Sequence, residues 1–339
     1  MSEEEGRTIS FFEKFLPLWV LLCILIGVLI SQIIPGISDA LNALKIGGIS
    51  VPIGICLFLM MYPAMLNLKA SELKKLGKNP KPIILTLISN WIVAPFIGLL
   101  MARIFLQGND DLILAIILLS SSPCTAMVLV WGWMAKGNQE QNVVNTSLNT
   151  ITIIFLYIPI VTFLTGIQNI SLDWVLLLIS LFFFIGLPLI VGLTSKKVLI
   201  SSKGEEWFTD TYRPFLGKIS IIALLATLII LFSMNGTALL DHPDYLLIVT
   251  IPLLVGFVIV VGYNILMTKI FKMKYREAII TVIIGSSSHF EIAIATAIAM
   301  NNTIAALGTT MGLFWEVPVM LSVVYLGRLL SKRGFWKSQ

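Results

Sequence analysis

The sequence contains 339 residues, of which 57% are hydrophobic and only 12% are charged, and its mean hydropathy is +0.95. About a quarter of the residues in a typical soluble domain are charged, so this composition excludes a water-soluble globular protein. The formal net charge of +5 does not indicate nucleic-acid binding, because the basic residues lie in short loops between apolar runs, where they determine membrane topology.

Ten apolar runs follow one another along the chain, each close to the roughly twenty residues that a helix needs to cross a ~30 Å hydrocarbon core. The acidic start, MSEEEGRTIS, lacks the small-residue cleavage site of a signal peptide, so the first run is expected to remain as a helix. The predicted spans cover residues 15–34, 51–68, 82–106, 112–135, 143–166, 173–195, 214–234, 245–270, 277–300 and 304–330.

The basic residues give these spans an orientation. All 23 Lys and Arg residues except Lys45 and Arg103 lie in the amino-terminal segment, in the loops after the even-numbered spans, or in the tail. Because basic loops stay in the cytoplasm, both termini are predicted to be cytoplasmic. The sequence therefore predicts a multi-pass protein of the plasma (cytoplasmic) membrane.

Five spans in each half imply that a duplicated unit would enter the membrane from opposite sides, as in the inverted repeats of many secondary transporters. The predicted fold is an all-α polytopic membrane protein with ten transmembrane helices in two inverted five-helix repeats. The predicted parts are a cytoplasmic segment (1–14), a first repeat (15–166), a second repeat (173–330) and a cytoplasmic tail (331–339).

A serine triplet interrupts the same span of each half: 120–122 in the fourth and 286–288 in the ninth. Serines can bond to their own helix carbonyls without other effect. However, Pro123 follows the first triplet, and His289 and Glu291 follow the second, which favours broken helices. A break in hydrocarbon is tolerated only where its backbone groups are satisfied, so the two breaks are expected to meet at the midplane and to bind a polar solute.

Few ionisable side chains lie within the spans. Glu291 and Glu316 are candidates for an ion site or a proton carrier; alternatively, Glu291 pairs with a neighbouring helix and Glu316 braces the kink at Pro318. His289 could titrate near neutral pH or fill space as a hydrogen-bonded side chain. Arg103, at the end of the third span, is expected to reach the outer interface. Three amides are expected to satisfy broken backbones or to join helices: Asn90, Asn149 and Asn264.

The three cysteines lie within apolar runs without CxxC spacing, which indicates neither a disulfide framework nor a zinc site. Cys23 and Cys56 stand among Leu and Ile, where a thiol acts as a small hydrophobic group. Cys124 directly follows Pro123, so it is either a packing residue or a soft ligand for a soft solute. No cofactor is expected, and nothing resembles a nucleotide-binding loop.

The segment Pro123-Cys124-Thr125-Ala126-Met127-Val128-Leu129-Val130-Trp131 resembles the fourth-span signature of the arsenite efflux permeases, within the bile-acid/arsenite/riboflavin transporter superfamily. The resemblance runs through nearly the whole chain and implies ten spans, with spans four and nine crossing. One departure is that Ser288 and His289 stand where the family commonly has asparagines. Other matching segments are Met61-Tyr62-Pro63, Asn90-Trp91-Ile92-Val93-Ala94-Pro95, Phe290-Glu291-Ile292-Ala293 and Glu316-Val317-Pro318-Val319-Met320-Leu321.

The resemblance implies export of trivalent arsenic, as arsenite and often also as antimonite, driven by the proton gradient. The family's functional cysteine falls on Cys124, the As(III) thiol contact, and its functional glutamate on Glu291. Arsenite is mostly the neutral trihydroxide at neutral pH, so hydroxyl side chains suit its OH groups, and a single thiol allows its release. The expected substrate-binding residues are Cys124, Ser121, Ser122, Thr125, Ser287 and Glu291; those for proton coupling are Glu291 and Glu316; the supporting ones are Asn90, Trp91, Asn149 and His289.

Two other functions are weighed. A sodium-coupled symporter of organic anions, of the bile-acid type, would use Glu291 with Asn and Ser oxygens as a hard-cation site, but sodium has no use for the thiol of Cys124. A membrane sensor is disfavoured because the loops are short and no soluble domain is evident. An enzyme is not expected, nor is a soluble ATPase subunit; the expected partners are the arsenic solute, protons and the lipid bilayer.

Overall fold

The computed structural model describes residues 15–34, 36–46, 49–66, 80–125, 127–168, 170, 175, 178–179, 182–241, 244–300 and 302–337. The predicted segment 1–14, part of the sixth predicted span and the last two residues of the tail lie outside this part of the chain. The described residues are almost entirely helical, apart from a short antiparallel pair of strands, β1 (Lys45–Ile46) and β2 (Ile49–Ser50).

Within the described residues, each predicted apolar range falls mainly on one helix or on consecutive helices. The first half contains α2 (Leu16–Ile33), α3 (Ile37–Ala43), α4 (Val51–Leu66), α5 (Pro80–Ile88), η2 (Ser89–Val93), α6 (Ala94–Phe105), α7 (Asp110–Ser120), α8 (Met127–Met134) and α9 (Gln139–Ile167). The second half contains η3 (Phe182–Gly186), α11 (Leu187–Lys203), α12 (Glu205–Trp207), η4 (Phe208–Tyr212), α13 (Arg213–Asp241), α14 (Asp244–Ile270), α15 (Tyr275–Ser286), α16 (Phe290–Ala299) and α17 (Thr303–Lys332).

Within the described ranges, five continuous helical stretches are long and apolar enough to cross a membrane, and a sixth is added if the bent pair α2 and α3 counts as one span. The chain is therefore a polytopic membrane protein, while ten spans in two inverted repeats stays a prediction. Predicted spans four and nine are each divided into two short helices, α4 in the second span has 16 residues, and the sixth span is only partly described. The five stretches are Pro80–Phe105, Gln139–Ile167, Glu205–Met234, Leu247–Ile270 and Thr303–Lys332.

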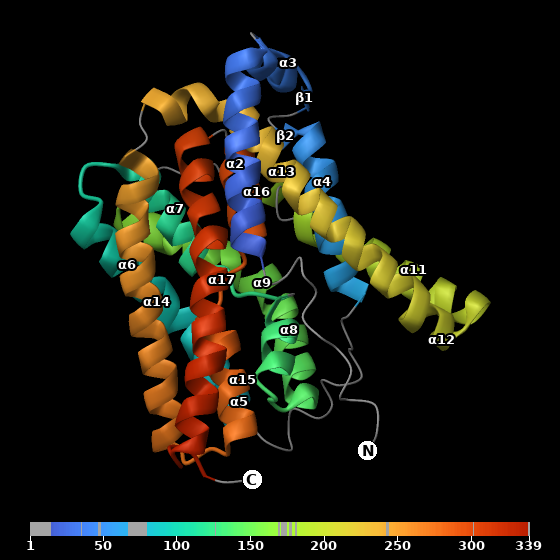
Figure 1. The fold of residues 1–339 in the computed structure, drawn as a ribbon, viewed down its shortest axis with the longest axis vertical. Coiled ribbons are helices and arrows are strands. Elements are labelled where there is room, and N and C mark those ends of the chain that lie inside the picture. Colours follow the sequence, from blue (N-terminus) through green and yellow to red (C-terminus); the bar gives the residue numbers. More distant parts are fainter. Residues whose placement is uncertain are drawn as a thin grey trace.

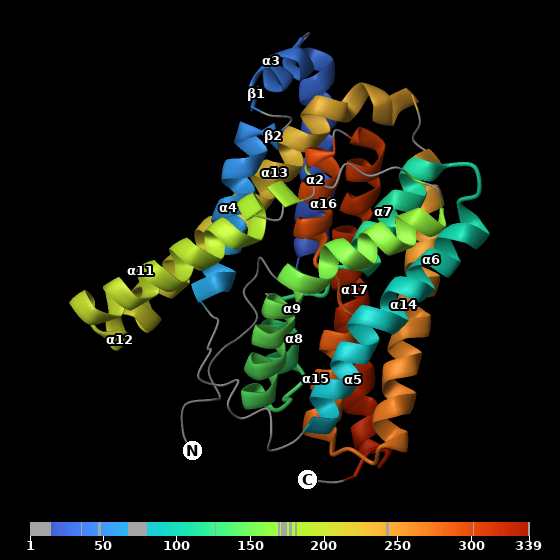
Figure 2. The ribbon, with the colours of Figure 1, turned by 180° about the vertical axis from the view of Figure 1, so that it is seen from behind.

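The helices form two groups. In Figures 1 and 2, α4, α11 and α13 lie together on one side of the molecule, and α6, α14, α15 and α17 lie on the other. Helix α13 packs against α2 and α4, and α11 packs against α4. In the second group, α14 packs against α6 and α15, while α17 packs against α7 and α16. The divided helices α7/α8 and α15/α16 both belong to the second group.

Two matched features accompany the divided segments. The helix that follows each one begins at an asparagine cap: the Asn138 side chain accepts from Gln141 N at 3.2 Å, and that of Asn302 accepts from Ala305 N at 2.8 Å. Such caps satisfy one of the free amides of a helix start. In addition, an indole N–H donates to a threonine on a neighbouring helix in each half, Trp91 to Thr152 (3.1 Å) and Trp315 to Thr250 (3.0 Å). The caps lie at corresponding places in the two halves, whereas in the indole pairs the tryptophan and the threonine have exchanged helices.

Helices α2 and α13 approach each other closely at glycines. A Cβ atom added to Gly27 would lie 2.6 Å from the Cβ of Phe232 and 2.8 Å from the backbone oxygen of Ile229. Since the second of these atoms belongs to the backbone, a side chain at this position would force the helices apart.

We therefore expect Gly27→Ala to destabilise the purified protein by about 1–3 kcal/mol, the usual cost of overpacking a closely packed contact. The measurement is the thermal unfolding midpoint in detergent. Gly262→Ala is the matched control, because Gly262 is exposed on α14 and an added Cβ would meet no atom within 4 Å. Equal midpoints for the two variants would contradict the close α2–α13 contact.

Candidate functional site

The two divided segments meet each other directly. Pro123 and Ser288 form an isolated antiparallel bridge. The amide of His289 donates to the backbone oxygen of Ser122 at 2.6 Å, and the amide of Cys124 donates to that of Ser287 at 3.3 Å. Each break therefore satisfies backbone groups that the other exposes. The predicted breaks are present and in contact; their position at a membrane midplane stays a prediction.

Local sequence explains why α7 stops where it does. Pro123 has no N–H to donate and disfavours a helical conformation at Ser122. The Ser122 hydroxyl bonds back to the carbonyls of Leu118 (3.0 Å) and Leu119 (3.1 Å), and it also lies 3.2 Å from the carbonyl of His289. Ser122 was expected to bind substrate, but its hydroxyl is already used in joining the two segments.

On the other side of the crossing, Asn264 of α14 holds the end of α15. Its Nδ2 lies 2.8 Å from Ser89 Oγ, 3.0 Å from Ser286 Oγ and 3.1 Å from the carbonyl of Gly285. Ser89 itself donates to the Gly285 carbonyl at 2.7 Å. A side chain at Gly285 would not fit, because an added Cβ would lie 2.9 Å from Asn264 Oδ1. The amide thus connects three helices at the second break.

A second amide pair supports the first break. Asn90 Nδ2 donates to Asn149 Oδ1 at 3.1 Å, and Asn149 Nδ2 donates to the backbone oxygen of Cys124 at 3.4 Å. The neighbouring Trp91 is bonded to Thr152 on the same helix as Asn149. These contacts connect Asn149, and Asn90 through it, to the segment that carries the cysteine, while Trp91 is bonded to α9.

The ionisable residues gather beside the second break. Ser288 Oγ donates to Glu316 Oε2 at 2.9 Å, and His289 Nε2 lies 3.4 Å from Glu291 Oε2. His289 and Glu316 are almost completely buried, at 0% and 1% exposure, and Glu291 is 8% exposed. The structure therefore brings the two predicted coupling carboxylates and the histidine close together in space. Glu291 lies on α16, Glu316 on α17 and His289 in the turn before α16.

Several buried polar atoms at the crossing have no hydrogen-bond partner. A buried polar group without a partner costs about 1–3 kcal/mol, so such groups are rare unless they serve a ligand or water. Threonines elsewhere bond to helix carbonyls, as Thr150 does to Thr146 and Thr165 to Val161. The unpartnered atoms at the crossing are Ser121 Oγ, Thr125 Oγ1, Ser287 Oγ, His289 Nδ1 and Glu316 Oε1, while His289 Nε2 and Glu291 Oε2 have only each other, at 3.4 Å.

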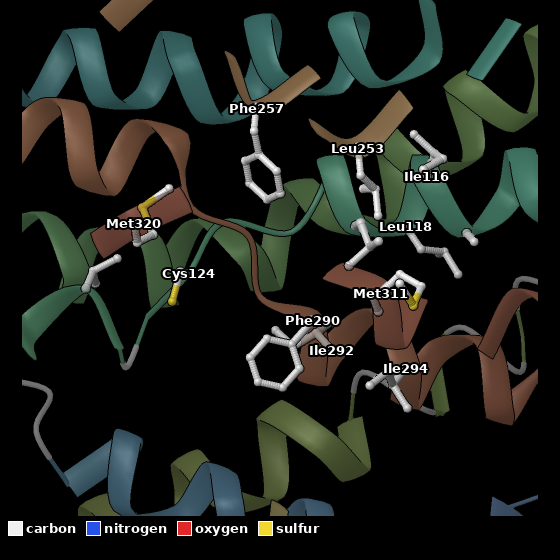
Figure 3. Packing of buried hydrophobic residues seen from close by; sticks show 14 of the residues in the cluster. Ile116, Leu118, Cys124, Leu253, Phe257, Phe290, Ile292, Ile294, Met311 and Met320 are labelled. Atoms are coloured by element: carbon white, nitrogen blue, oxygen red, sulfur yellow. The ribbon is translucent and has the colours of Figure 1, made fainter. Parts of the chain in front are cut away.

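A small cavity of about 60 Å³, open on one side, lies beside the crossing. Cys124, Glu291 and Glu316 are not among its lining residues. Figure 3 shows the sulfur of Cys124 pointing away from Leu253 and Phe257, which line the cavity. The sequence predicted one hydroxyl-lined pocket around the thiol; the structure has a cavity on one face of the crossing and the thiol directed elsewhere. The lining residues are Asn90, Ala94, Ile97, Gly98, Ile116, Leu119, Ser120, Ser122, Pro123, Pro252, Leu253, Gly256, Phe257, Val260 and Ser286 to Ser288.

Sequence reasoning did not assign these walls or the role of Ser89. The available signal was the position of Asn264 as an amide within an apolar run, but its partners depend on tertiary packing.

Among the described residues, no three His, Cys, Asp or Glu side chains are placed to hold a metal ion. Cys124 is buried, at 2% exposure. A single thiol is suited to a passing soft solute rather than to a resident metal.

Comparisons with known proteins agree with this architecture. Residues 54–242 match the model of the sodium bile acid symporter family. The chain belongs to this family. It is 37% identical to an uncharacterised transporter of Synechocystis over 98% of its own length and 91% of that protein. It is 35% identical to the arsenical-resistance protein Acr3 of Alkaliphilus metalliredigens (94% and 93% coverage) and 28% identical to that of Corynebacterium glutamicum (96% and 91%).

The two Acr3 relatives confirm the resemblance to the arsenical-resistance permeases that the motif around Cys124 indicated. The protein is accordingly a multi-pass membrane transporter and not an enzyme.

Replacing Asn264 by leucine tests the connection at the second break. Asn264→Leu leaves the hydroxyl of Ser286 and the end of α15 without this partner, so we expect a loss of about 1–3 kcal/mol of stability. The readout is the thermal unfolding midpoint. Ser201→Ala is the control, since the exposed Ser201 hydroxyl bonds only within α11. A midpoint for Asn264→Leu equal to that of the control would show that the amide does not support the break.

Proposed function

We propose that this transporter exports arsenite from the cytoplasm by proton antiport. The observation that carries the proposal is the group of buried, unpartnered hydroxyl, imidazole and carboxylate atoms where the divided helices cross, directly beside Cys124. A buried site with unused donors and acceptors fits a small solute that has several OH groups. The names of the two Acr3 relatives, which are arsenical-resistance proteins, support arsenic as the central atom of this solute.

The thiol and the hydroxyls have different roles in this proposal. As(III) is thiol-seeking, and Cys124 offers one sulfur, which permits a bond weak enough to break in each transport cycle. Ser121, Thr125 and Ser287 offer hydroxyls that do not bond within the described structure and can exchange hydrogen bonds with As–OH groups. Antimonite, a trihydroxide of the same shape and softness, is expected to be carried as well.

Proton coupling is assigned to Glu291 and Glu316. Ser288 connects the two helices, since it lies in the turn before α16 and donates to Glu316 on α17. His289 and Glu291 are within 3.4 Å of each other. In the proposed cycle, a proton from outside and arsenite from inside occupy the crossing alternately, so that entry of one requires departure of the other.

The proposed setting follows from the charge distribution of the loops. Two inverted repeats, residues 15–166 and 173–330, would each contribute one divided helix to the crossing, with both termini cytoplasmic and the carrier in the plasma membrane. The proton gradient supplies the driving force in this scheme, so no ATPase subunit takes part.

The test is arsenite accumulation by everted membrane vesicles with an imposed proton gradient, acidic inside. We expect accumulation by the wild type and a loss of about tenfold or more in Cys124→Ala and Glu291→Gln, each equivalent to at least about 1.4 kcal/mol of lost interaction. Cys56→Ala is the thiol control and should accumulate arsenite like the wild type. Equal accumulation by Cys124→Ala, Glu291→Gln and the wild type would refute the mechanism.

A second candidate is sodium-coupled uptake of organic anions, favoured by the name of the matching family model. The buried carboxylate oxygens of Glu291 and Glu316 would then serve a hard cation. In this case transport would require sodium and survive Cys124→Ser. We expect the opposite: arsenite accumulation unchanged when sodium is replaced by choline, and abolished by Cys124→Ser.

A further inference from the structure

The cavity beside the crossing differs in character from the group of unpartnered polar atoms. Among the described residues that line it, none is an Asp, Glu, His, Lys or Arg. An ion without a partner is strongly disfavoured in such surroundings. The cavity is therefore suited to a neutral molecule.

One end of the cavity is lined by serines, and one of their hydroxyls is available to hydrogen-bond a ligand. Ser120 donates to the carbonyl of Ile117, Ser122 to that of Leu118, and Ser286 accepts from Asn264. The Ser287 hydroxyl has no partner, although the residue is only 6% exposed. The carbonyl of the same residue accepts the amide of Cys124, so this polar end lies next to the backbone of the cysteine.

The remaining walls are apolar. Leu253 and Phe257 project from α14, Ile116 and Leu119 from α7, and Ile97 from α6; Figure 3 shows Leu253, Phe257 and Ile116 around this space. Inorganic arsenite has hydroxyls on all three positions of arsenic, so it would leave these walls without an apolar partner. A pocket of this kind favours a ligand that combines an apolar body with a polar head.

We propose that the cavity accepts neutral organic trivalent arsenicals, R–As(OH)₂, in which an alkyl or aryl group replaces one hydroxyl of arsenite. This inference rests on the proposed export of arsenite and extends its substrate class. A hydroxyl of the head bonds to Ser287, and the organic group lies against Leu253 and Phe257. Binding in the cavity needs no covalent step.

Gly256 offers a way to fill the apolar part of the cavity. It lines the cavity, and a Cβ added there would have Met101 Cγ, at 3.8 Å, as its nearest neighbour. An added Cβ therefore fits at this lining position, and a leucine there is expected to reduce the space in the cavity. Gly262, six residues further along α14, is exposed, is not a lining residue and has no atom within 4 Å of an added Cβ.

The experiment measures accumulation of arsenite and of phenylarsonous acid, C₆H₅–As(OH)₂, in everted vesicles, with arsenic quantified by mass spectrometry and leakage subtracted using vesicles without the carrier. Wild type and Gly262→Leu should accumulate both. Gly256→Leu should lose phenylarsonous acid transport by about tenfold or more, the scale of discrimination that an apolar pocket provides, and arsenite transport by less than about twofold.

The outcomes separate this inference from the proposed function. A wild type that carries arsenite but not phenylarsonous acid overturns the inference alone, and so does equal loss of both solutes in a Gly256→Leu protein with an unchanged unfolding midpoint. A wild type that carries neither overturns the proposed function. If Gly256→Leu unfolds, Gly256→Ala decides: a smaller loss restricted to phenylarsonous acid supports the inference, and no selective loss overturns it.

Discussion

The need to satisfy backbone amides and carbonyls wherever a helix is interrupted within a membrane governs the structure. Hydrocarbon offers no hydrogen bonds, so a break survives only if protein groups complete it. Here the two interrupted segments complete each other through the Pro123–Ser288 bridge, and the amides of Asn149 and Asn264 supply what the bridge does not. The amides come from η2 (Asn90), α9 (Asn149) and α14 (Asn264), so these three segments lie beside the crossing.

This arrangement leaves side chains, rather than backbone, available to a solute. Because the backbone of each break bonds mainly to the other break or to amides, the hydroxyls of Ser121, Thr125 and Ser287 remain without partners in a buried place. An ordinary helix would have used them in bonds to its own carbonyls, as it does for Thr150 and Thr165. A crossing of broken helices thus concentrates unused hydrogen-bonding capacity at the point where a transporter needs it.

Sequence reasoning located the divided segments, since a serine triplet with Pro123 and a second with Glu291 are unusual within apolar runs. It also selected the residues whose polar atoms prove unpartnered, among them Ser121, Thr125 and Ser287. It could not assign the cavity, because an apolar wall formed by α6, α7 and α14 depends on how three helices approach one another. It likewise placed Ser122 and the Cys124 thiol in the same pocket, since side-chain direction at a break does not follow helical periodicity.

The glycine contact between α2 and α13 has a mechanical consequence. Where Gly27 lies against the backbone oxygen of Ile229, and Gly236 against the short side chain of Ser31, little side-chain volume separates the two backbones. Helices joined in this way resist relative translation and rotation, whereas contacts through long side chains can repack. We therefore expect α2 and α13 to move together as one rigid pair. The relative movements of helices in a transport cycle are then expected at other helix contacts.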